Sequence, residues 1–167
     1  MRRWVESAMV AVAVLSTTGC LSGFKHPLGP PSEGFIDKAL LGSWQCRGTD
    51  DSATVDFLLD LTFVDFDGWQ YLLQSDDHTS VPESVQVIAT RVGGATFLSL
   101  RGVAPKSEDE WAVVRYSFVD SSHLSLGWVD PDDFEDVIDD RQAVRDRLAT
   151  RLDDPKLVDE LGPCQRL

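Results

Sequence analysis

The sequence predicts a mainly β domain, in which an antiparallel meander of strands closes into a barrel and is followed by C-terminal α-helices. From Gly42 onward apolar and polar residues alternate with a period of two, which is typical of strands with one buried face. Short turns rich in Gly and Asp separate these stretches. After Trp128 the apolar residues recur every three or four positions, as on a helix that packs against a sheet.

Residues 53–63 show the strand alternation most clearly, because every second side chain there is apolar. Val55, Leu59 and Phe63 belong to this apolar face, and Asp56 and Thr62 lie on the opposite one. Seven strands are predicted in meander order, at residues 42–47, 53–63, 69–74, 85–92, 95–101, 111–119 and 123–129.

Tight turns connect several of these strands. Asp67-Gly68 and Gly93-Gly94 are strong hairpin signals, and residues 120–122 connect the last pair of strands. A meander has two edge strands that must be paired or covered, because unpaired edges promote aggregation. Closure into a barrel is the simplest way to remove both edges.

Two helices are predicted after the strands. The first begins at Asp130-Pro131, and its stripe that packs on the sheet is Phe134, Val137, Ile138, Arg141, Val144, Leu148 and Leu152. The second is short, with Asp154 as N-cap, Pro155 at the first helical position and Gly162-Pro163 after its end. It returns Cys164 to the first strand.

The start of the chain predicts export and a lipid anchor. Arg2 and Arg3 precede an apolar core at residues 8–15, which is too short for the roughly 20 residues of a spanning helix. Residues 16–20 resemble the lipobox of bacterial lipoproteins, in which small residues precede a cysteine that is diacylated, although Thr17 stands where that family prefers Leu. Residues 1–19 are therefore expected to be a signal peptide and Cys20 the lipidated residue. The alternative is a soluble periplasmic protein with Cys20 as an ordinary thiol.

The residues after Cys20 are expected to form a lipidated tether at 20–34. Its prolines and glycines forbid a helix and favour extended, solvated backbone. Leu21 stands where, by resemblance to enterobacterial sorting, an Asp would retain the protein at the inner membrane. The expected location is the outer membrane, on the side that faces the periplasm, with the domain at residues 35–167.

Charge and cysteine content limit the partners. The formal net charge of −13 argues against nucleic acid and anionic headgroups as partners, and it favours a basic protein partner or none.

Once Cys20 is assigned to the lipid, Cys46 and Cys164 remain as a pair in an oxidising compartment, and a disulfide is expected. A metal site is the rival interpretation, but the sequence has no CxxC motif to support it.

One short motif indicates a family. Leu41-Gly42-Ser43-Trp44, behind a turn at residues 35–40, resembles the G-x-W signature that opens lipocalin-like (calycin) barrels, and it is similar to the start of a group of uncharacterised bacterial lipoproteins. The resemblance gives Gly42 and Trp44 structural roles, with Trp44 packed across the closed end. It also implies eight strands and an attached C-terminal helix, whereas seven predicted strands would allow an open or split barrel.

A ligand cavity is the candidate functional site. Trp69, Tyr71, Tyr116 and Trp128 are the predicted ligand-contacting residues, because apolar pockets are rich in aromatic side chains. Trp111 is a further aromatic candidate. An eight-stranded barrel is just wide enough to be filled by side chains or to hold one small ligand, so a filled core is the alternative.

Catalytic and metal sites are not predicted, and neither is a cofactor. His26, His78 and His123 lie far apart in the chain, and Ser121-Ser122-His123 is expected not to form a nucleophile and base, because adjacent residues on a turn do not point at each other. The acidic run at 130–140 lacks the spacing of a calcium loop. It is instead expected to lie in the first half of the helix, with arginines in the second half, as the helix macrodipole favours.

These observations together predict a non-catalytic, lipid-anchored envelope protein that binds a small apolar ligand or an envelope partner. The alternative is an acidic protein-interaction module, such as an inhibitor or an assembly factor, with a filled core and no ligand.

Overall fold

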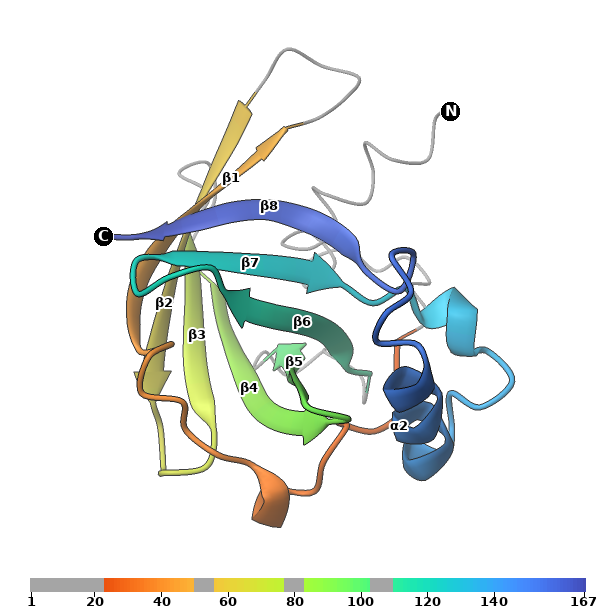
Figure 1. Ribbon diagram of the computed structural model, residues 1–167. Helices are drawn as coiled ribbons and strands as arrows, with labels where there is room; N and C mark the ends of the chain where they lie inside the picture. Colours follow the sequence, from red (N-terminus) through yellow and green to blue (C-terminus); the bar gives the residue numbers. More distant parts are fainter. Residues whose placement is uncertain (1–22, 50–55, 77–82, 103–109) are drawn as a thin grey trace.

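The computed structural model describes residues 23–49, 56–76, 83–102 and 110–167. Eight antiparallel strands form a closed barrel in which each strand pairs with the next along the chain, and the eighth pairs with the first (Figure 1). The elements in chain order are η1 (Pro31–Glu33), β1 (Gly42–Thr49), β2 (Asp56–Asp65), β3 (Tyr71–Asp76), β4 (Glu83–Val92), β5 (Ala95–Gly102), β6 (Ala112–Phe118), β7 (His123–Trp128), η2 (Pro131–Phe134), α2 (Arg141–Thr150) and β8 (Asp159–Arg166).

The predicted fold class, a mainly β meander barrel with a C-terminal helix, is confirmed. The alternation of side chains along each strand explains why the sheet has two different faces. On β4, successive side chains point to opposite faces of the barrel wall. Val85 and Val87 point into the barrel, whereas Ile88 and Val92 point outward. All four are buried, since the outer face of this strand is covered as well.

The count of seven strands was wrong, because β8 completes the barrel. It pairs with β7 along most of its length and with β1 at Trp44, Gln45 and Cys46. The second predicted helix, from Asp154 to Gly162, overlaps this strand and is also wrong. Helix-capping residues favour a helix only weakly. Here β7 and β1 supply hydrogen-bond partners for the backbone of β8, and these contacts outweigh the local preference for a helix. Gly162, with φ of 108°, lies beside the irregularity in register opposite Leu126 and Gly127.

The first predicted helix is divided in two. Asp130 caps η2 through Asp132 N, and Asp140 caps α2 by accepting hydrogen bonds from Gln142 N and Ala143 N. Each carboxylate starts its own helical segment, so the chain turns between them. The stripe still packs as expected: Phe134, Val144 and Leu148 are buried, and Val137, Ile138 and Leu152 pack against them.

Two apolar clusters result. The inner core lies inside the barrel and comprises Leu40, Trp44, Cys46, Leu61, Phe63, Tyr71, Leu73, Val85, Val87, Ala89, Leu98, Val114, Tyr116, Leu124, Leu126 and Cys164. The outer layer lies between the wall and the covering segments and comprises Phe24, Leu28, Ile88, Val92, Phe97, Trp111, Val113, Val129, Phe134, Val144, Leu148 and Leu157.

Residues 23–34 contribute to the outer layer, so this segment is only partly solvated: Lys25, His26 and residues 31–33 are exposed. Phe24 and Leu28 are each 1% exposed. Leu28 N donates to Ser99 Oγ of β5 at 3.0 Å, and Arg141 Nε of α2 donates to Pro27 O at 2.9 Å. The prolines and glycines do prevent a regular helix here, apart from the single turn η1. The side chains of Phe24 and Leu28 nevertheless pack against the outer face of the barrel.

Candidate functional site

The barrel interior is the candidate site, and its two ends differ. The Trp44 end is the end at which β1 begins and β6 finishes, and the Trp128 end is the opposite one, at which β7 finishes. Residues 35–41, the closing segment, lie at the Trp44 end and place Phe35, Ile36, Leu40 and Leu41 against the inner core.

Trp44 is fully buried and holds the closing segment in place. Its Nε1 donates to Leu40 O at 2.9 Å. The Arg166 guanidinium lies 4.4 Å from the centre of its ring, and Arg166 also donates to the carbonyl oxygens of Ala39 and Leu41. Gly42, with φ of 109°, lets the chain turn from the closing segment into β1, in a conformation that a side chain would strain. The barrel and this end are compatible with the lipocalin-like fold expected from the G-x-W motif.

Asp37 is the polar centre of the closing segment. Its backbone N donates to Tyr71 Oη at 2.5 Å, and Tyr116 Oη donates to its Oδ2 at 3.0 Å. Burial raises the pKa of Tyr71 to about 12. Burial and the Asp37 charge also raise the pKa of Tyr116. Both phenols therefore stay protonated at neutral pH, and Tyr116 can donate to the carboxylate.

The four predicted ligand-contacting aromatics lie in three different places. Tyr71 and Tyr116 belong to the inner core, but their hydroxyls bind the closing segment. Trp69 packs against the outer layer, so it does not line the interior. Trp128 is half-buried against the inner core. Trp111 lies in the outer layer, where the Arg101 guanidinium stacks 4.6 Å from the centre of its ring.

Half-buried apolar side chains lie at both ends of the interior, and those at the Trp128 end are on the barrel strands. Leu59, Leu100, Trp128 and Leu161 are half-buried and pack against the inner core. Each lies near the end of its strand: Leu59 near the start of β2, Leu100 near the finish of β5 and Leu161 near the start of β8. Apolar side chains with part of their surface exposed are suited to contact an apolar ligand.

The expected disulfide is present. Cys46 of β1 and Cys164 of β8 face each other, with their sulfur atoms 1.97 Å apart, and both are buried in the inner core. The bond crosses the seam at which β8 meets β1, where only three residue pairs are in register.

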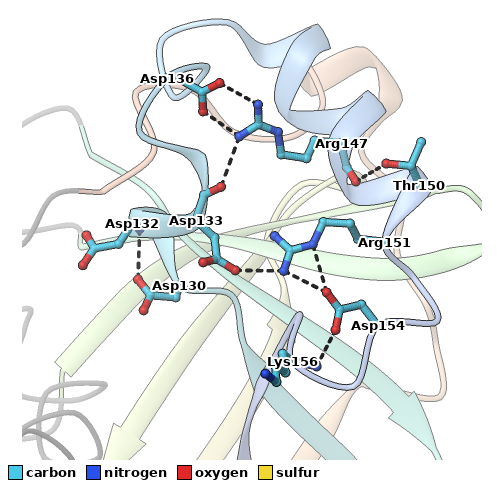
Figure 2. Close-up of polar contacts among 9 residues, drawn as sticks. All are labelled: Asp130, Asp132, Asp133, Asp136, Arg147, Thr150, Arg151, Asp154 and Lys156. Atoms are coloured by element: carbon cyan, nitrogen blue, oxygen red, sulfur yellow. Dashed lines mark hydrogen bonds and ion pairs between the residues drawn. The ribbon is translucent and has the colours of Figure 1, made fainter.

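Two residues of the acidic run, Asp136 and Asp133, form ion pairs with Arg147 of α2 and with Arg151, which directly follows α2 (Figure 2). Arg147 donates to both carboxylate oxygens of Asp136, at 2.6 and 2.7 Å, and to Asp133 O at 3.2 Å. Arg151 lies between the carboxylates of Asp133 and Asp154, at 3.0 and 2.9 Å. The acidic residues thus lie before α2 instead of in its first half, and the ion pairs fasten the η2 turn to the helix. Among the described residues, no three His, Cys, Asp or Glu side chains are placed to hold a metal ion.

Ser122 and His123 do approach each other, contrary to the expectation for adjacent turn residues. Ser122 Oγ lies 3.1 Å from His123 Nδ1, and the same nitrogen lies 2.9 Å from Asp120 Oδ2. A serine hydrolase needs the serine and the carboxylate on opposite nitrogens of the histidine, so that one accepts a proton while the other orients the ring. Here both compete for Nδ1, and the cluster stabilises an exposed hairpin turn.

Two residues of the site were missed in the sequence. Asp37 gives no signal beyond that of an ordinary turn residue, since its partners lie 34 and 79 positions away. Arg166 stands two residues after Cys164, so a disulfide between β1 and β8 already brings it near Trp44.

Searches against protein-family models, curated proteins and solved structures found no match to this chain. No helix within the described residues is both long and apolar enough to cross a membrane.

Proposed function

We propose that this protein is a lipid-anchored component of the bacterial envelope whose barrel binds a small apolar ligand without catalysing a reaction. The observation that carries the proposal is the difference between the two barrel ends. At the Trp44 end the half-buried apolar side chains belong to the closing segment, which Trp44 holds, or to Phe118 beside Trp44, whereas those at the Trp128 end lie on the barrel strands themselves.

The ligand contacts follow from this difference. The hydroxyls of Tyr71 and Tyr116 are hydrogen-bonded to the closing segment. Of the predicted aromatic residues, Trp128 therefore remains available to contact a ligand, together with Leu59, Leu100 and Leu161. Their aliphatic and indole surfaces favour an elongated hydrocarbon group over a polar ligand, because such surfaces offer few hydrogen-bonding groups. An eight-stranded barrel holds at most one small ligand of this kind.

The binding test uses the mature protein with Cys20→Ser, titrated with a fluorescent fatty-acid probe. We expect saturable binding that is strongly weakened by Leu100→Trp, which fills the interior near the Trp128 end. Phe66→Ala is the matched control, because Phe66 is 65% exposed and lies in the β2–β3 turn at the Trp44 end. Folded wild-type protein that binds no probe would contradict the ligand proposal.

The anchor has its own support in the sequence. An apolar core and a lipobox-like junction precede Cys20, and several acyl chains together hold a protein firmly at a membrane where one chain gives only marginal binding. Leu21 favours the outer membrane, with the domain facing the periplasm. Replacing Cys20 with Ser should release the domain into the soluble envelope fraction and abolish palmitate labelling. Labelling that persists in the variant would exclude this anchor.

A second candidate function is an acidic interaction module. It is favoured by the exposed acidic residues around η2 and the start of α2, which are Asp132, Asp133, Glu135, Asp136, Asp139 and Asp140. If this surface binds a basic partner, Asp132→Asn with Glu135→Gln should weaken partner capture and its salt dependence, and should leave probe binding unchanged. A partner whose capture is insensitive to both charge and salt would argue against this candidate.

A further inference from the structure

The lipid anchor, if it forms on Cys20, is joined to a point of the domain that is firmly fixed. Phe24 makes an isolated antiparallel bridge with Trp111: Phe24 N donates to Trp111 O at 2.9 Å, and Trp111 N donates to Phe24 O at 2.7 Å. The Phe24 ring is buried, with its centre 5.5 Å from that of Phe134. Gly23 N donates to Glu110 Oε2 at 3.1 Å, so the backbone is held from Gly23 onward.

The segment after Phe24 is held at several further points. Besides the hydrogen bonds of Pro27 and Leu28 to the barrel and α2, Arg145 Nη1 donates to Leu28 O at 3.1 Å and forms an ion pair with Glu33 at 2.5 Å. The chain between the lipid and the barrel is therefore not the fifteen-residue tether expected from composition. It is reduced to the few residues before Phe24.

Phe24 lies at one particular end of the barrel. Its partner Trp111 directly precedes β6, so the bridge is at the Trp128 end. Phe118, the last residue of β6 at the Trp44 end, is seven residues further, a distance of about 23 Å along a strand. The anchor and the closing segment are thus at opposite ends.

The reach of the anchor is short on this scale. Four Cα–Cα steps separate Cys20 from Phe24, and a fully extended chain of that length spans at most about 14 Å. A fully extended free tether over residues 20–34 would reach about three and a half times as far and would leave the domain free to rotate.

We infer that the anchor holds the barrel with its Trp128 end against the lipid bilayer and its Trp44 end directed away from it. This inference rests on the proposed lipidation of Cys20, and it identifies the surface of a phospholipid bilayer as what this end contacts. Leu59, Leu100, Trp128 and Leu161 then face the membrane side. The exposed apolar residues Phe66 and Val119, which lie in turns at the Trp44 end, face the aqueous side.

Photo-crosslinking of the full lipidated protein tests the orientation. A benzophenone amino acid replaces either Ser84 or Phe66, which are both exposed and lie at the Trp128 and Trp44 ends respectively. The protein is reconstituted in vesicles of phosphatidylethanolamine and phosphatidylcholine, since its acidic surface is repelled by anionic lipids. We expect several-fold more lipid adduct at position 84 than at position 66. Equal adducts, or more at position 66, would overturn the inference.

A lengthened anchor provides the matched control. Inserting about 12 Gly and Ser residues between Ser22 and Gly23 adds a flexible span of about 20 Å, which should bring the two adduct yields close together. A ratio unchanged by this insertion would also overturn the inference, because a cause other than the short anchor would then set the orientation. The intact mass of the protein separates the two proposals. A Cys20 without acyl chains contradicts the proposed anchor and this inference with it, whereas an acylated protein with equal adducts contradicts the orientation alone.

Discussion

Asp37 and the two tyrosines that bind it connect the closing segment to two strands of the barrel that are not neighbours. Tyr71 begins β3 and Tyr116 lies near the finish of β6, so their hydroxyls meet at Asp37 from different strands. Each tyrosine combines a buried ring with a hydroxyl that is hydrogen-bonded to Asp37, an arrangement in which both the apolar area and the polar group are satisfied. Ionisation of either phenol would place a second negative charge beside Asp37.

This cluster predicts a loss of stability in alkali. The pKa of Tyr71 is about 12 in the folded protein against about 10 in the unfolded chain. A raised folded-state pKa means that the stabilisation is complete below pH 10 and is lost as the pH rises towards 12, by roughly 2 to 3 kcal/mol for Tyr71. Tyr116 adds to the loss in the same direction.

The measurement is the free energy of urea unfolding across this pH range, with phenolate absorbance followed in parallel. The variant with Tyr71→Phe and Tyr116→Phe should have lower stability at neutral pH and a flatter pH dependence above pH 10. An equally steep dependence in that variant would assign the alkaline loss to other groups.

Trp44 is the second residue whose replacement has a clear expected cost. Trp44→Ala removes a fully buried ring, the hydrogen bond to Leu40 O and the surface on which Arg166 stacks. We expect a loss of about 3 to 5 kcal/mol in the free energy of unfolding, because the cavity left behind collapses only partly. Phe66→Ala, which changes an exposed ring at the same end, should stay within about 0.5 kcal/mol of wild type. A fully stable Trp44→Ala protein would refute the closing role of this residue.

At the scale of single elements, β8 is the one that makes the barrel closed. It pairs with β7 at six positions but with β1 at only three, and Cys46–Cys164 reinforces the shorter seam. Replacing both cysteines with Ser should lower the free energy of unfolding by about 4 to 5 kcal/mol in the chain-entropy model, less if the native bond is strained. Denaturant unfolding of this variant and of reduced wild-type protein should give similar midpoints. Stability unaffected by either treatment would contradict a role for the bond in holding the seam.

The elements that could be predicted from sequence are those in which alternation itself sets the burial. In β6, Val114, Tyr116 and Phe118 alternate with outward-facing residues, and this strand was found within two residues of its bounds. β8 has no such pattern, since it contains Gly162 and Pro163 and its side chains are mostly exposed or half-buried. Its strand conformation comes from neighbours far away in the chain, so local patterns could not reveal it.

The same reasoning explains the outcome at the site. Tyr71 and Tyr116, which were predicted to line the interior as aromatic side chains, do lie in the inner core, because they are at inward-facing positions of their strands. Trp69 has the parity of Tyr71, but it precedes β3 and belongs to the turn, where alternation does not apply. The contacts of Asp37 with both tyrosines depend on the closed barrel, and no local signal encodes them.

At the scale of the whole molecule, residues 23–34 behave as part of the folded domain. A chain that begins at residue 35 would lose Phe24 and Leu28 from the outer layer and expose the wall of β4 and β5. Burial of one such side chain is worth about 1.5 to 3 kcal/mol, so the shortened chain should be less stable by several kcal/mol. The comparison is with a chain that begins at Gly23, by thermal and denaturant unfolding. Equal stability of the two would show that this segment only rests on the barrel.

The closed seam also determines the order of events when the chain folds. The cysteines that join β1 to β8 are 118 residues apart. Pairing of β1 with β8, its second neighbour, therefore requires almost the whole domain to be present. Contacts between such distant residues form slowly, and an unpaired strand edge can meanwhile pair with another chain. We therefore expect closure to be a late step of folding. Until it occurs, the Cys46 thiol stays open to wrong partners, and protection against aggregation and mispairing matters most during this interval.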